Sequence, residues 1–110
     1  MADKPSDIVH GTLDMLILKT LALEPMHGYG VTVRLEQISK GTLRVNAGSL
    51  FVALQRLQRA GVIRSEWKAT ENSRRAKYYI LTHQGRKRLA SETREWGRQV
   101  AAITRILEAS

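Results

Sequence analysis

The stretch that most constrains the fold of this 110-residue chain is residues 45–81, which combine one amphipathic helix with two short strand-like runs. Asn46 is expected to cap the helix, because its side-chain oxygen can accept a backbone N–H from the first turn. Gly61 is expected to end the helix, since glycine tolerates the positive φ that is common after a helix. Between them one apolar stripe recurs at helical spacing, formed by Leu50, Leu54 and Leu57.

The two runs, over residues 63–68 and 77–81, alternate along their length as strands do. The polar segment between them carries Arg74 and Arg75 and is expected to form the tip of a β-hairpin. We expect Trp67, on the first run, to pack this hairpin against the core. A helix followed directly by a hairpin with a basic tip predicts a winged helix.

The positive charge of the chain is concentrated in the same region. Residues 56–88 contain ten Lys or Arg and two acidic residues, a net charge of +8, whereas the remaining residues carry eight of each sign. A clustered cationic patch is typical of proteins that bind a polyanion, so the helix and hairpin with this patch favour nucleic acid. A basic surface that is simply solvated is the alternative. The basic residues are Arg56, Arg59, Arg64, Lys68, Arg74, Arg75, Lys77, Arg86, Lys87 and Arg88.

Three motifs stand in a specific order and spacing: HGYG at 27–30, LRVNAGSL at 43–50 and NSRRAKYYILTHQGR at 72–86. Together they resemble the PadR family of winged-helix transcriptional regulators, over about residues 11–107. The resemblance implies a DNA-binding regulator that dimerises through its C-terminal helix and N-terminal region. One departure is Phe51-Val52, where the family usually has Tyr-Pro after GSL. A DNA contact through that tyrosine hydroxyl therefore cannot be carried over.

Composition excludes several kinds of chemistry. The chain has no cysteine, so it can form neither a disulfide nor a thiolate metal site. Its histidines, His10, His27 and His83, are too widely spaced to predict a metal site, and no nucleophile–base set stands out. We therefore expect no metal, no cofactor and no enzymatic activity. No leader and no apolar run of membrane length is present, which predicts a cytoplasmic, nucleoid-associated protein and no membrane contact.

Residues 1–10 are polar and are expected to form a partly disordered arm. A first helix should run from a Thr12 cap to Leu23. Leu18 and Leu23 lie off its apolar stripe, so they predict either a subunit contact or burial within the same domain.

A second helix is expected to reach Ser39 and to end at Gly41. Tyr29, at its start, is interpreted as a core residue. The segment 42–45 is extended and is predicted to pair with the hairpin as a third strand.

The last helix is expected to begin at a Thr82 cap and to continue for about 26 residues, roughly 39 Å at 1.5 Å per residue. Its apolar positions follow a 4-3 spacing with one polar member, which is typical of a coiled-coil seam. A second copy of the chain would cover this seam, and packing along the first helix of the same chain is the alternative. The seam comprises Leu89, Thr93, Trp96, Val100, Ile103 and Leu107.

The candidate DNA contacts fall into two groups. The wing residues Arg74, Arg75 and Lys77 are expected to meet phosphates or the minor groove. The helix between Asn46 and Gly61 is the expected recognition helix. Its front and outer face is expected to read base edges, because Gln and Arg bind bases bidentately. Phe51 is interpreted either as half-buried or as a contact to a thymine methyl. The other residues of the helix group are Asn46, Ser49, Val52, Gln55 and Arg56.

The sequence thus predicts a mainly α fold with a small β-wing: a winged helix-turn-helix domain over 11–81 and a C-terminal dimerisation helix over 82–110. The predicted function is a homodimeric, sequence-specific regulator of transcription, a repressor on an inverted-repeat operator in double-stranded DNA. The alternatives are an RNA- or protein-binding winged helix and a non-specific architectural DNA-binding protein. Some relatives hold flat aromatic effectors through a tryptophan in the last helix. Trp96 therefore predicts either an effector contact or plain dimer packing.

Overall fold

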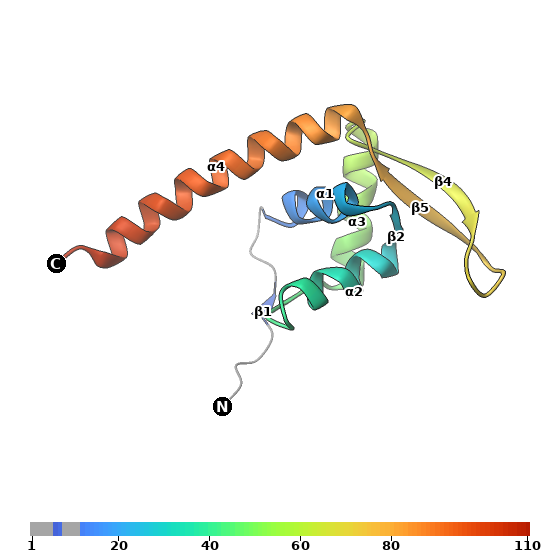
Figure 1. The fold of residues 1–110 in the computed structure, drawn as a ribbon, viewed down its shortest axis with the longest axis horizontal. Coiled ribbons are helices and arrows are strands. Elements are labelled where there is room, and N and C mark those ends of the chain that lie inside the picture. The colour runs from blue at the N-terminus through green and yellow to red at the C-terminus, as the bar shows by residue number, and fades with distance from the viewer. Residues whose placement is uncertain (1–5, 8–11) are drawn as a thin grey trace.

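The computed structural model describes Ser6–Asp7 and residues 12–110 (Figure 1). The arm expected over residues 1–10 therefore lies outside the described residues, apart from its two-residue strand, and so does His10. The elements follow in the order β1 (Ser6–Asp7), α1 (Leu13–Leu23), β2 (Met26–His27), α2 (Gly28–Ile38), β3 (Leu43–Arg44), α3 (Ala47–Arg59), β4 (Ile63–Ala69), β5 (Arg75–Leu81) and α4 (His83–Glu108).

A single core holds α1, α2 and α3 against the sheet. The predicted stripe of α3 is buried within this core, which removes its leucines from water and anchors the helix. Leu18 of α1 is fully buried too, so burial within the domain explains this residue. Leu23, at the end of α1, remains 48% exposed, so burial within the domain does not explain this residue and a subunit contact stays a prediction.

The three-stranded sheet has the order β2-β5-β4 and is antiparallel. The predicted third strand was wrong, because β2 occupies the free edge of β5 through the pairs Met26↔Tyr79 and His27↔Tyr78. Leu43–Arg44 instead pairs in parallel with Ser6–Asp7. Strands of two residues are too short for periodicity to identify their partner, so only the packing of α1 and α2 decides which segment reaches the wing.

The last helix begins at a close junction with the end of α3 and the start of β4. The hydroxyl of Thr82 accepts a hydrogen bond from Gly85 N at 3.1 Å and donates one to the carbonyl of Gly61 at 2.8 Å. A Cβ atom on Gly85 would lie 2.0 Å from the carbonyl oxygen of Val62 and 2.5 Å from Leu81 Cδ1. Only glycine therefore allows α4 to leave the wing at this angle.

Gly85→Ala should destabilise the fold, because the methyl group must displace either the backbone at Val62 or the start of α4. We expect the free energy of unfolding in urea to fall by about 1–3 kcal/mol, the usual range for overpacking. The matched control is Gly97→Ala on the same helix, where a Cβ meets nothing within 4 Å. That substitution should stabilise by up to about 1 kcal/mol through helix propensity alone. Equal effects at the two positions would show that the junction tolerates a side chain.

Candidate nucleic-acid interface

The outer face of α3 is built as the sequence predicts. Asn46 caps the helix by accepting a hydrogen bond from Ser49 N at 3.0 Å, and both residues are exposed. Val52 and Gln55 are also exposed on this helix. Phe51 is 53% exposed, and its ring lies beside Gly28 at the start of α2. The half-buried interpretation of Phe51 therefore holds, and its contact with a thymine methyl stays a prediction.

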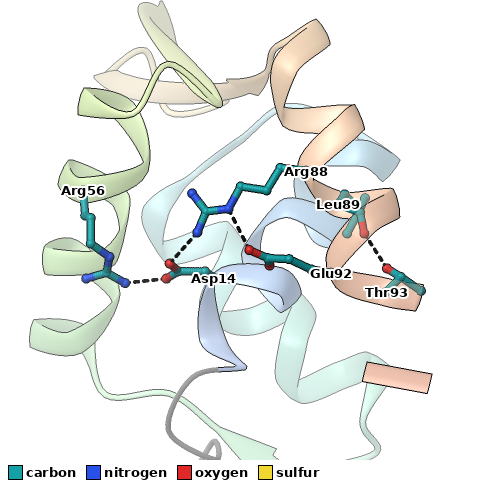
Figure 2. Close-up of polar contacts among 6 residues, drawn as sticks. All are labelled: Asp14, Arg56, Arg88, Leu89, Glu92 and Thr93. Carbon is teal, nitrogen blue, oxygen red and sulfur yellow. Dashed lines mark hydrogen bonds and ion pairs between the residues drawn. The ribbon is translucent and has the colours of Figure 1, made fainter. Parts of the chain in front are cut away.

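Arg56 lies in an ion-pair network that joins three helices (Figure 2). Its guanidinium donates to one carboxylate oxygen of Asp14 on α1, while Arg88 of α4 donates to the other oxygen at 3.1 Å. Arg88 also donates to Glu92 at 2.7 Å. Arg56 thus has a structural partner in Asp14, and base reading by this residue remains a prediction.

The wing is a hairpin of two seven-residue strands with a tight polar turn. In the turn Thr70 N donates to the carbonyl of Arg74 at 2.6 Å, and Ser73 has a positive φ of 61°. Arg74 and Arg75 are exposed at this tip. Lys77 follows on β5, with its ammonium 5.7 Å from the centre of the Tyr79 ring. The three predicted wing cations are thus brought to one end of the hairpin.

Two aromatic residues, Trp67 and Tyr29, lie on the surface and not in the core as their sequence context predicts. Trp67 was expected to pack the wing on the core, yet it is 60% exposed, because the long hairpin carries its outer half beyond the helices. Tyr29 was expected in the core, yet it is 75% exposed at the first turn of α2. The length of the two strands could have indicated that Trp67 is exposed, because a long hairpin extends past the core. The signal for Tyr29 was its position off the α2 stripe of Val31 and Leu35.

His27 has a structural position rather than a ligating one. It caps α2 by accepting a hydrogen bond from Gly30 N at its Nδ1 atom, 3.0 Å away, and its ring meets the Tyr78 ring edge-on at 5.4 Å. Among residues 6–7 and 12–110, no group of three His, Cys, Asp or Glu residues could hold a metal ion. Over the same residues, no helix is both long enough and apolar enough to span a bilayer.

Beyond its first turns, α4 leaves the domain and projects away from it (Figure 1). Leu89 packs against the core, so the alternative of packing within the same chain holds for this end of the seam. The remaining apolar positions stay exposed, up to 79% for Leu107, and Ile106, which the spacing missed, is 73% exposed. Thr93 donates its hydroxyl to the carbonyl of Leu89 at 2.7 Å, so the one polar seam residue is satisfied inside its own helix.

The buried face of α3, its exposed outer face and the adjoining basic hairpin define a winged-helix protein of the nucleic-acid-binding class. Residues 17–91 match the transcriptional regulator PadR-like family, which is more than half of the chain. The chain belongs to this family. It is therefore a DNA-binding regulator of transcription and not an enzyme.

Individual proteins show the same relationship. The chain is 26% identical to a PadR-like transcriptional regulator from Bacillus cereus, with a TM-score of 0.79 over 91% of this chain and 95% of that one. A PadR family regulator from Eggerthella lenta is 29% identical, with a TM-score of 0.76 over 91% of this chain and 85% of that one. An uncharacterised protein X of Lysinibacillus sphaericus is 25% identical over 94% of each chain.

Asp14→Asn should destabilise the domain, because the amide cannot accept two charge-assisted hydrogen bonds from arginines as the carboxylate does. The Asp14 side chain is only 17% exposed, so we expect a loss of about 1–2 kcal/mol in the free energy of unfolding by urea. Glu95→Gln is the control, since its pair with Arg98 is largely exposed and contributes less than about 0.5 kcal/mol. If the unfolding curves of Asp14→Asn superimposed on those of the parent protein, the ion pairs of Asp14 would not contribute to the stability of the fold.

Proposed function

We propose that the protein is a homodimeric repressor that binds an inverted-repeat operator in double-stranded DNA. The observation that carries the proposal is the exposed apolar stripe of α4, which continues past the domain that positions the wing. Residues at this spacing are covered most simply by the same stripe of a second copy. In this proposal residues 11–81 bind DNA and residues 82–110 pair the subunits. Occupation of the operator would exclude polymerase, which makes repression the simplest consequence.

Each subunit would place α3 in a major groove, with its capped front end and Gln55 toward the bases and the wing beside it on the backbone. The exposed positions of Val52 and Gln55 and the cationic wing tip support this arrangement. Two-fold symmetry of the protein then requires two-fold symmetry of the site. Half-site centres would lie one or more helical turns apart, each of roughly 10 bp.

The same geometry provides a route for regulation. The junction at Gly85 and the ion pairs of Asp14 connect the first turns of α4 to the end of α3 and the start of α1. A change in the angle between two paired α4 helices would therefore move both recognition helices. Trp96 is 39% exposed on the stripe, and dimer packing accounts for it; a flat aromatic effector held there would act through this angle.

The proposal is tested by selecting fragments from a random duplex library and measuring the dissociation constant for selected and scrambled duplexes at one salt concentration. An operator-binding regulator should prefer the selected sequence by about 10³-fold or more. An architectural DNA-binding protein would show the salt dependence without the preference. An RNA-binding module would instead prefer the matching RNA. In the cell, the proposal places the protein in the cytoplasm, on the nucleoid.

The double variant Arg74→Ala, Arg75→Ala should bind every duplex more weakly and show a flatter dependence of log K on log salt, by about 2 units of slope. The physical reason is the loss of two phosphate contacts at the wing tip. Fluorescence anisotropy on labelled duplex at several salt concentrations measures both quantities. Arg94→Ala with Arg98→Ala removes the same charge from α4 and should leave most of the affinity. Equal losses in the two double variants would mean that total charge, and not the wing, attracts DNA.

Val100→Asp should give monomers, because it places a carboxylate in the middle of the proposed α4 contact. Sedimentation equilibrium would give the mass, and binding to the selected duplex should weaken at least tenfold because one subunit grips only one half-site. Gln99→Asp is the matched control, since it adds the same charge on a neighbouring exposed polar position. If the Val100→Asp variant remained dimeric, the subunit contact would have to be formed by another surface of the chain.

A further inference from the structure

The two faces of the wing differ in how their charges are neutralised. On one face Glu66 binds Lys68 at 3.2 Å and Arg64 at 3.5 Å. The hydrogen bond from Lys68 is the main reason that the pKa of Glu66 is lowered. Lys68 also lies over the Tyr78 ring, 5.7 Å from its centre. The cations of this face therefore have partners on the wing itself.

The opposite face carries two cations that form no ion pair with a described residue, and the Lys77 ammonium lies over the Tyr79 ring of the same face. The register of the hairpin sets Trp67 opposite Lys77 and Ala69 opposite Arg75, and cross-strand partners share a face. Neither Lys77 nor Arg75 forms an ion pair with any described residue of the chain. Nearer the core, the same face holds the buried pair of Ile63 and Leu81, so it is a continuation of the side that packs on the helices.

Trp67 stands in this face at the point where the core ends. It is 60% exposed, which leaves a large apolar ring in water on the same face as Lys77 and Arg75. Small Ala69 follows it on the same face and does not cover it. Tryptophan is enriched at interfaces, because its ring buries a large apolar area against a partner. A partner that satisfies both features must combine negative charge with apolar surface, as the phosphates and deoxyribose rings of a DNA backbone do.

We propose that Trp67 is the apolar contact of the wing with duplex DNA, with its indole against the sugar-phosphate edge while Lys77 and Arg75 neutralise the adjacent phosphates. The contact is independent of base sequence, so it contributes affinity to every duplex. The inference rests on the proposed function, because it assumes that the wing lies on the backbone beside the groove that α3 occupies. If the selected duplex bound without contacting Trp67, an acidic protein surface would be the partner that fits this face instead.

Tryptophan fluorescence tests the contact directly, because Trp67 and Trp96 are the two tryptophans of the chain. In the variant Trp96→Phe, saturating amounts of the selected duplex should change the emission of Trp67 and reduce its quenching by acrylamide at least twofold. The change should follow the binding curve obtained from anisotropy of labelled DNA. The reciprocal variant Trp67→Phe should lose this response. Unchanged emission and unchanged acrylamide quenching in Trp96→Phe with all protein bound would overturn the inference.

Substitution provides a second, independent measurement. Trp67→Ala should weaken binding to selected and scrambled duplexes by about tenfold each, as expected for loss of one aromatic contact to nucleic acid. Trp67→Phe should retain much of that affinity. The unfolding free energy of Trp67→Ala should match that of the parent protein, since the ring is mainly in solvent. Equal affinity of Trp67→Ala and parent would overturn the inference alone, whereas a parent protein that binds no duplex would overturn the proposed function with it.

Discussion

The structure depends on the contact between Gly85 and the carbonyl oxygen of Val62. There the last helix, the end of the recognition helix and the first wing strand meet with no room for a side chain. Because Thr82 also binds the carbonyl of Gly61 and caps α4, the three elements share one set of hydrogen bonds. The direction of α4 is therefore determined by the same few atoms that end α3.

Asp14 forms a second connection about one turn further along α4, at Arg88. Its carboxylate binds one arginine from α3 and one from α4, so the first helix bridges the other two (Figure 2). Arg56 therefore ties the end of α3 to the start of α1, while Arg88 ties the start of α4 to the same carboxylate.

Much of the fold follows from local sequence rules. The caps at Asn46 and Thr82 and the buried stripe of α3 were predicted from side-chain chemistry and spacing, and the hydrogen bonds and burial confirm them. The third strand was predicted wrongly, because a two-residue strand has no period of its own. Trp67 and Tyr29 were misplaced for a related reason: an aromatic residue fits a core or a binding surface equally well, and only the extent of the core distinguishes the two.

By itself, then, the sequence determined where the helices and the two wing strands lie, which face of α3 is apolar, and where the positive charge is gathered. These properties depend on neighbours within a few positions along the chain. Tertiary structure alone decided that β2 completes the sheet, that Arg56 binds Asp14, and that Trp67 remains exposed on the wing. Such features join residues far apart in the chain, so they exist only once packing has brought those residues together.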